Sequence, residues 1–274
     1  MDHMTSQVET MAAKIQGYKQ DLGNSGVQGR RRLQAIEGMT DHITLRRIEG
    51  LGIKEGWRCF EVGCGSGSIA RWMSYRVAPH GHVLAVDMNT EFVADAAGPT
   101  LEVSQQDIRT MKPPEKTFDL VHSRMVLQHL AEREELVERL VATLKPGGWL
   151  LLEEMETFSL FQNESGPFLQ VVEIMHAMGR AAGTAVDWAR TLPRTFQRLG
   201  LQNVNAEGEM LYFSGGTPTA DFHRLTGEQH WPYAEKMRLL TREQFDQYSE
   251  RLGDPNSWFY GPTIFGVWGQ RPPA

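Results

Sequence analysis

Between about residues 55 and 155, the hydrophobic pattern of the chain predicts strands that alternate with helices. Short apolar or β-branched runs recur there at the spacing of an α/β protein, and acidic or other polar residues stand at their ends. The segments that carry the pattern are 60–70, 82–87, 101–108, 118–124 and 144–154. Five such signals in order predict a mostly parallel sheet.

The segment from Phe60 to Ala70 is typical of a strand that turns into a helix around a ligand. Its glycines at 63, 65 and 67 permit positive φ angles and bring the backbone close to a bound molecule. A helix starting near residues 66–68 points N–H groups towards that molecule. The dinucleotide fingerprint G-x-G-x-x-G needs a glycine where this chain has Ser68, so a nicotinamide cofactor is the weaker alternative. From this segment alone, an incidental turn also stays open.

The run from His82 to Asp87 lies where a βαβ crossover would place the second strand. A carboxylate at the end of that strand can accept hydrogen bonds from both hydroxyls of a ribose. The alternative is that Asp87 caps a helix beginning near residues 89–90. Because the glycine turn precedes it, we interpret Asp87 as a ribose ligand.

Three more segments complete the pattern. Asp107 and Ile108 follow a short strand candidate and form a pair able to bond an adenine amino group and cover its ring. The fourth strand candidate ends in the polar residues His122, Ser123 and Arg124. A Pro-Gly-Gly turn at 146–148 precedes an apolar run of the kind found in buried parallel strands.

On these motifs the chain resembles the class I S-adenosylmethionine-dependent methyltransferases, especially the bacterial small-molecule branch of quinone-biosynthesis and natural-product enzymes. The resemblance is close over residues 55–155 and loose elsewhere. It implies a Rossmann-like α/β fold with a seven-stranded, mostly parallel sheet and an antiparallel last strand. It also implies an N-terminal helical cap over residues 1–52 and a methyltransferase domain over 53–274, with substrate-binding helical insertions at 155–185 and 215–256 over the active site.

The resemblance assigns cofactor contacts by position. The loop from Glu61 to Gly67 would wrap the methionine part of S-adenosyl-L-methionine, Asp87 and the adjoining Met88 would lie at the ribose, and residues 122–124 would lie beside the sulfonium. Tyr18 is a candidate lid aromatic or, alternatively, a half-buried packing residue. The full set is Tyr18, Glu61, Gly63, Cys64, Gly65, Gly67, Asp87, Met88, Asp107, Ile108, His122, Ser123 and Arg124. The expected product is S-adenosyl-L-homocysteine.

Methyl transfer is an in-line displacement that needs alignment and a dry cavity, and a hydroxyl acceptor adds the need for a base. Three candidates stand near the sheet edge: His122, Glu154, and His129 on the helix expected after the fourth strand. Each has a structural alternative, since His129 can pack, His122 can bond a backbone carbonyl and Glu154 can cap or pair. Magnesium-dependent relatives need an acid where this chain has His122, so no metal is expected.

The second half of the chain offers a candidate substrate pocket. Residues 167–178 predict a helix whose phenylalanines and methionines suit an adaptable apolar wall, although such a stripe can equally be plain core. Residues 186–200 predict one crossover helix, and residues 263–269 predict the final strand.

Composition limits the partners. The formal net charge of −6 argues against nucleic acid, and the short basic cluster Arg30–Arg32 is interpreted first as a solvated helix face and second as a contact to a carboxylate. No apolar stretch has the length of a membrane span or the pattern of a secretion signal, so a cytoplasmic protein without membrane partners is expected. Cys59 and Cys64 are expected to be small buried residues.

The predicted function is therefore methyl transfer from S-adenosyl-L-methionine to a small, partly apolar metabolite of secondary metabolism. Oxygen is the preferred acceptor atom, with carbon and nitrogen open, and a homo-oligomer is also left open. One alternative is a cyclase, an isomerase or a ligand-binding protein that holds the cofactor without transferring methyl. The other is a nicotinamide oxidoreductase.

Overall fold

The computed structural model describes residues 24–274, so Tyr18 lies outside the described residues. The chain divides into two compact units. We call the unit made of Thr40–Glu156, Asp187–Glu209 and Ile264–Ala274 the sheet unit. The helical unit comprises Met1–Met39, Thr157–Val186 and Met210–Thr263.

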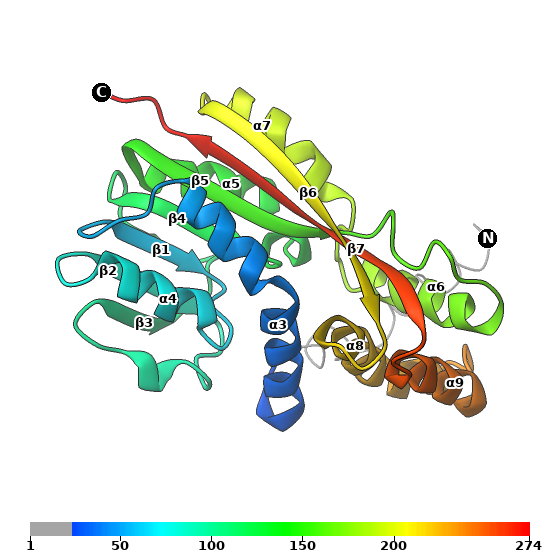
Figure 1. The fold of residues 1–274 in the computed structure, drawn as a ribbon. Helices are drawn as coiled ribbons and strands as arrows, with labels where there is room; N and C mark the ends of the chain where they lie inside the picture. The colour runs from blue at the N-terminus through cyan, green and yellow to red at the C-terminus, as the bar shows by residue number, and fades with distance from the viewer. Residues whose placement is uncertain (1–23) are drawn as a thin grey trace. The chain divides into compact units, whose positions relative to one another are not determined.

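A seven-stranded sheet in the order β3-β2-β1-β4-β5-β7-β6 confirms the predicted fold class (Figure 1). Its first five strands pair in parallel, and β6 and β7 run in opposite directions (Figure 1). The strands are β1 (Arg58–Val62), β2 (His82–Asp87), β3 (Leu101–Gln105), β4 (Phe118–Arg124), β5 (Leu144–Glu156), β6 (Gln202–Ser214) and β7 (Trp258–Gln270). The last strand is thus longer than the predicted 263–269.

The central strands are rich in buried apolar residues because both faces of a parallel sheet are covered. Cys59, Phe60 and Val62 of β1 are fully buried, and the Phe60 ring stacks on Phe118 of β4 with centroids 5.0 Å apart. The register places Glu61 of β1 beside His122 of β4. Two polar side chains from neighbouring buried strands are thereby held next to each other.

Helices and short 3₁₀ turns connect the strands of the sheet unit. They are α4 (Ser68–Val77), η1 (Ala94–Ala96), η2 (Leu127–His129), α5 (Arg133–Thr143), η3 (Trp188–Thr191) and α7 (Leu192–Arg198), together with the second half of α3 (Gly26–Gly50). The single helix predicted over 186–200 is therefore a 3₁₀ turn followed by a short helix. Pro193 at the start of α7 accounts for the break, since proline fits the first turn of a helix and not its interior.

The helical unit has its own core of aromatic rings. It contains the first part of α3 with α6 (Gly166–Ala181), α8 (Pro218–Lys236) and α9 (Arg242–Gly253). Phe161 contacts Phe168 at 5.1 Å and Phe259 at 5.7 Å between ring centroids. The stripe on α6 that suggested a pocket wall, including Phe168, Met175 and Met178, is buried in this core. These side chains therefore pack as core residues, which was the alternative to a pocket wall.

Within residues 24–274, no helix combines the length and apolar character needed to cross a membrane.

Candidate cofactor site and its buried charge network

The glycine turn follows β1 directly and has the backbone expected from its sequence. Gly63, Gly65 and Gly67 have φ angles of 74°, 55° and 86°, and α4 begins at the next residue. A Cβ at Gly63 would lie 2.2 Å from the Val126 side chain, so the turn has no room for one there. The N–H groups of Gly63 and Cys64 donate to the carbonyl of Val86 at 2.8 and 3.1 Å, which ties the turn to β2.

Asp87 ends β2 beside this turn. Its Oδ2 accepts a hydrogen bond from the Gly65 N–H at 2.9 Å, and its Oδ1 accepts one from the Asn89 N–H at 3.0 Å. No regular helix begins near residues 89–90, where the chain forms turns before η1, so the helix-cap alternative is wrong. Each carboxylate oxygen can accept a second hydrogen bond, which leaves Asp87 able to bind a diol.

The pair expected at adenine differs in exposure. Ile108 is buried, whereas Asp107 is held by the guanidinium of Arg109, with Nη2 2.6 Å from Oδ2. Hydrogen bonding from Arg109 lowers the pKa of Asp107 below its usual value. Met88 exposes 59% of its surface. An adenine amino group would therefore share the Asp107 carboxylate with Arg109.

At the end of β4, Ser123 and Arg124 are fixed by hydrogen bonds. The Ser123 hydroxyl donates to the Val62 carbonyl at 3.1 Å, and Arg124 Nη1 donates to Asp41 Oδ1 of α3 at 2.8 Å. The same Asp41 oxygen accepts from Ser68 Oγ at 3.1 Å, at the first residue of α4. One carboxylate of α3 thus connects the end of β4 to the start of the helix behind the glycine turn.

His122 lies fully buried between two carboxylates. Its Nδ1 is 2.6 Å from Glu61 Oε2 and its Nε2 is 3.0 Å from Glu153 Oε2. Carboxylates only accept, so two such bonds require both ring nitrogens to carry a proton. Burial alone would lower the pKa of His122, but Glu61 and Glu153 outweigh it and raise that pKa to about 9. The ring is an imidazolium at neutral pH.

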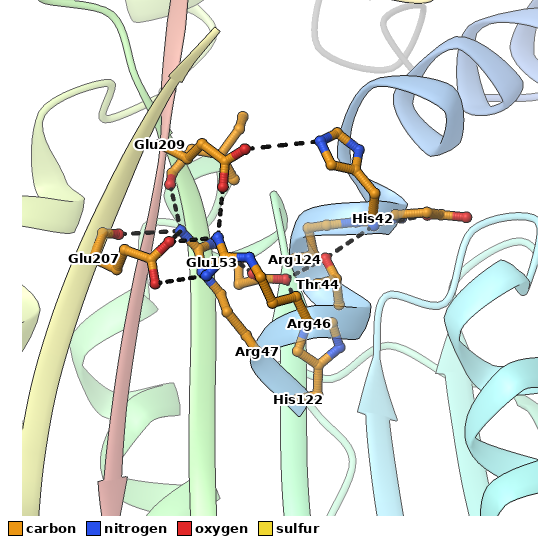
Figure 2. A network of polar contacts seen from close by, with 11 residues as sticks. His42, Thr44, Arg46, Arg47, His122, Arg124, Glu153, Glu207 and Glu209 are labelled. Atoms are coloured by element: carbon orange, nitrogen blue, oxygen red, sulfur yellow. Dashed lines mark hydrogen bonds and ion pairs between the residues drawn. The ribbon is translucent and has the colours of Figure 1, made fainter. Parts of the chain in front are cut away.

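Glu153 receives three donors in all, two of them from α3. Besides His122, Thr44 Oγ1 donates to Glu153 Oε2 at 2.5 Å and Arg47 Nη1 donates to Oε1 at 2.6 Å. Burial would raise the pKa of Glu153, yet His122, Arg47 and Thr44 together lower it to about 2. We call Glu61, His122, Glu153 and Arg47 the buried charge network. Figure 2 shows His122, Glu153 and Arg47 of this network. Two carboxylates and two cations balance its charge.

The network continues to the surface through α3. Arg46 Nη2 lies 2.5 Å from both Glu207 Oε1 and Glu209 Oε2 of β6, and His42 Nε2 lies 3.7 Å from Glu209 Oε1 (Figure 2). Exposed pairs of this kind contribute about 0–1 kcal/mol each. The buried charge network therefore contributes more to the attachment of α3 than these exposed ion pairs do.

Glu154, the next residue of β5, has a different environment. Its Oε1 accepts from the N–H groups of Leu127 and Gln128 at 3.0 and 3.4 Å, while the buried Oε2 has no hydrogen-bond partner among residues 24–274. Burial raises the pKa of Glu154 to about 8, against the effect of these N–H donors. The carboxyl group is mainly protonated at neutral pH.

The remaining candidate base is at the surface. His129 is exposed at the end of η2, and the helix expected to carry it starts only at Arg133. The prediction of a helix was wrong here because Glu154 caps a 3₁₀ turn instead. Cys59 and Cys64 are buried free thiols, as expected, and burial raises the pKa of both.

Sequence reasoning missed the contributions of α3, which are Asp41, Thr44 and Arg47. The one available signal was Glu153, because a carboxylate that directly follows the buried run Leu150–Leu152 needs a cationic partner. In the part of the chain that the structure describes, no group of three or more His, Cys, Asp or Glu side chains could hold a metal ion.

Comparison with known proteins agrees with this geometry. Residues 60–152 match the family described as a methyltransferase domain. The trans-aconitate 2-methyltransferase of Mycobacterium tuberculosis is 27% identical over 230 residues, which are 82% of this chain and 80% of that protein. The chain is an S-adenosylmethionine-dependent methyltransferase. Neither the oxidoreductase nor the non-transferring alternatives are favoured.

Solved structures support the fold of the enzyme. A phosphoethanolamine N-methyltransferase of Haemonchus contortus, in complex with phosphomonomethylethanolamine and S-adenosylhomocysteine, aligns with a TM-score of 0.54 and 17% identity over 85% of this chain. The aligned part covers only 53% of the longer Haemonchus chain. The YcgJ protein of Bacillus subtilis aligns with a TM-score of 0.58 and 16% identity over 85% of this chain and 100% of its own.

The cofactor of the enzyme is S-adenosyl-L-methionine, and the residues at the glycine turn fit it. The turn lacks side chains where the backbone must approach a ligand, and Asp87 retains acceptor capacity for a ribose.

We predict that stability falls as pH rises from about 6.5 to 9. A histidine whose folded pKa is raised stabilises fully below its unfolded pKa of about 6.5, and that stabilisation is lost as pH passes the folded pKa of about 9. Urea unfolding gives the free energy of unfolding of the wild type and of His122→Gln. The gap between these two free energies should be about 3 kcal/mol smaller at high pH than at pH 6. His42→Gln, at an exposed pair, serves as the control, and a gap that stays constant with pH would contradict the imidazolium.

We also predict that Asp87→Asn weakens S-adenosylhomocysteine binding by about 1–3 kcal/mol, because charge-assisted hydrogen bonds to the ribose are lost. Calorimetry measures this directly. Asp95→Asn, at a nearby exposed carboxylate paired with Arg71, is the matched control and should bind normally. Equal affinity of the Asp87 variant and the wild type would refute the ribose assignment.

Proposed function

We propose that the enzyme transfers the methyl group to an oxygen atom of a small, partly apolar metabolite, in the manner of the bacterial natural-product and quinone-biosynthesis branch. The observation that carries the choice of oxygen is Glu154, a buried carboxyl group with a pKa of about 8 and one unpartnered oxygen. A hydroxyl acceptor needs a group that takes up its proton, and a pKa near the working pH suits that task. A carboxylic acid is already a carboxylate at neutral pH and needs no base. Transfer to carbon or nitrogen is the second possibility.

The geometry separates the three candidate bases. His122 already bonds two carboxylates and carries both ring protons, so we assign it a positioning role for Glu61 and Glu153. His129 is exposed, where water competes for its proton. Glu154 lies at the carboxyl edge of the sheet, which is where open α/β sheets bind their ligands. Glu154 is therefore the general base of the proposal.

The chemistry asked of the protein is modest. The cofactor supplies an activated methyl group whose sulfur leaves as a neutral thioether. We propose that the glycine turn, Asp87 and the Asp107–Ile108 pair hold the cofactor. Glu154 takes up the proton of the acceptor's hydroxyl group while the acceptor's oxygen forms the new bond to the methyl carbon. Alignment and exclusion of water then provide most of the rate.

The class of acceptor draws on the relatives. Trans-aconitate, named for the mycobacterial relative, is a small unsaturated carboxylic acid. We therefore propose small carboxylic or phenolic acids as the first acceptors to test. Release of S-adenosylhomocysteine with such a panel, and an O-methyl product in mass spectra, would support the proposal; methylation confined to nitrogen or carbon would contradict it.

We predict that Glu154→Gln lowers kcat by about 10²–10⁴-fold without weakening cofactor binding, because the amide keeps the bond to Leu127 N–H and loses the proton acceptor. In the wild type, kcat should rise with pH through about 8 as Glu154 becomes a carboxylate, and this rise should be absent from the variant. Glu135→Gln on the exposed side of α5 is the control. Undiminished turnover by the Glu154 variant would remove the base from the proposal.

A further inference from the structure

Arg32, from the basic cluster of the sequence, is a half-buried cation without a countercharge. In the helical unit its Nε donates to Thr226 Oγ1 of α8 at 3.1 Å, and its Nη1 donates to Asn24 Oδ1 at 2.9 Å. Its guanidinium carbon lies 5.0 Å from the centroid of the Phe222 ring. Both hydrogen-bond partners are neutral, and among residues 24–274 no carboxylate lies within 4 Å of it. Burial lowers the pKa of Arg32 to about 10.

Two acids of α8 close to Thr226 in the sequence already pair with another arginine. Asp221 and Glu228, which flank this face of α8, both pair with Arg224, at 2.8 and 2.6 Å. Other partly or fully buried arginines of the chain, such as Arg47 and Arg124, each have a carboxylate partner. Arg32 therefore departs from the rule that buried charge is paired.

A buried nitrogen without a partner among the described residues belongs to His223, which is close enough to Arg32 for the charge of Arg32 to lower its pKa. His223 neighbours Phe222 on α8, exposes only 7% of its surface, and its Nε2 has no hydrogen-bond partner in the described chain. Leaving such an atom unpaired costs about 1–3 kcal/mol. The ring is packed among Phe161 at 5.1 Å and Phe213 at 5.8 Å between centroids. Burial first, and the charges of His176 and Arg32 next, lower the pKa of His223 to about 3, so the ring is neutral.

The charges that act on two further histidines of this unit are positive. Burial lowers the pKa of His176 on α6 and of His230 on α8 to about 4, and the nearby charges of Arg180 and Arg32, respectively, act in the same direction. His230 Nδ1 donates to the Thr226 carbonyl at 2.8 Å. Three imidazoles could suggest a metal, but no metal-holding group exists among residues 24–274.

We propose that Arg32, Thr226 and His223 form a binding site for the carboxylate of a small acid with an apolar or unsaturated frame. The site lies within the helical unit and goes beyond the proposed function. A carboxylate supplies the missing countercharge and matches the fork of a guanidinium. It also accepts from His223 Nε2 when that nitrogen carries the proton of the neutral ring. The neighbouring phenylalanine rings suit the frame of the ligand.

The test is calorimetric binding of trans-aconitate to the full-length enzyme in the presence of S-adenosylhomocysteine. Arg32→Gln should weaken binding at least tenfold, Arg32→Lys should restore part of it, and Arg31→Gln, at an exposed position one residue away, should leave it unchanged. The uncharged trimethyl ester and inorganic phosphate are the comparison ligands, and both should bind more weakly than the acid.

Stability separates a binding site from a structural role. In thermal melts, trans-aconitate should raise the melting temperature of the wild type and leave that of Arg32→Gln unchanged. An equal rise in both proteins would show that Arg32 has only a structural role. The proposal is overturned if Arg32→Gln binds the acid as well as wild type does, if the ester binds equally well, or if no carboxylate of the acid panel binds.

Failure of the proposed function has a different signature. Should the acid bind through Arg32 while no acceptor releases S-adenosylhomocysteine, the anion site stands and the methyl-transfer proposal falls. Should an acceptor release S-adenosylhomocysteine while no acid binds through Arg32, the methyl-transfer proposal stands and the anion site falls.

Discussion

A protonated histidine between two buried carboxylates is the interaction on which the sheet unit depends. Glu61, His122 and Glu153 stand on three adjacent strands, and Arg47 joins them from α3. Burying these charges has a large unfavourable desolvation free energy. It is offset because each carboxylate has a cation within hydrogen-bond distance. Any one of the four residues, left alone, would be an uncompensated buried charge.

This constraint explains how the cofactor turn is held. Glu61 precedes Gly63 by two residues, so the His122 bond fixes the chain just before it turns. Asp41 acts from the same helix on Arg124 and Ser68, on the other side of the turn. The second half of α3 thus fixes both ends of the glycine turn, which we propose holds the cofactor. Gly266 of β7 leaves room for Arg47 because it has no side chain. A Cβ there would lie 2.7 Å from the Arg47 guanidinium carbon.

Much of the fold and of the cofactor turn could be predicted from the sequence, because local signals encode them. Apolar runs, glycines and terminal acids gave five strands and the turn at Gly63 within a few residues. The roles of Thr44 and Arg47 could not be predicted, since their partner Glu153 is about a hundred residues away and a single sequence carries no contact information. His122 looked like a base for the same reason: its two carboxylate partners come from other strands.

The two units differ in whether their buried cations have carboxylate partners. In the sheet unit every buried charge of the network is matched, which suits a rigid frame. In the helical unit Arg32 donates hydrogen bonds to neutral partners only, and His223 Nε2 has no partner among residues 24–274, which suits a site completed by a ligand. The contrast follows from burial and pairing alone.

The most direct measurement of the central claim is ¹⁵N NMR of the histidine rings at pH 8, with His122 identified by comparison with His122→Gln. The account predicts an imidazolium, with both ring nitrogens protonated and both N–H groups protected from exchange. A neutral ring with one N–H, titrating near pH 6.5, would contradict it.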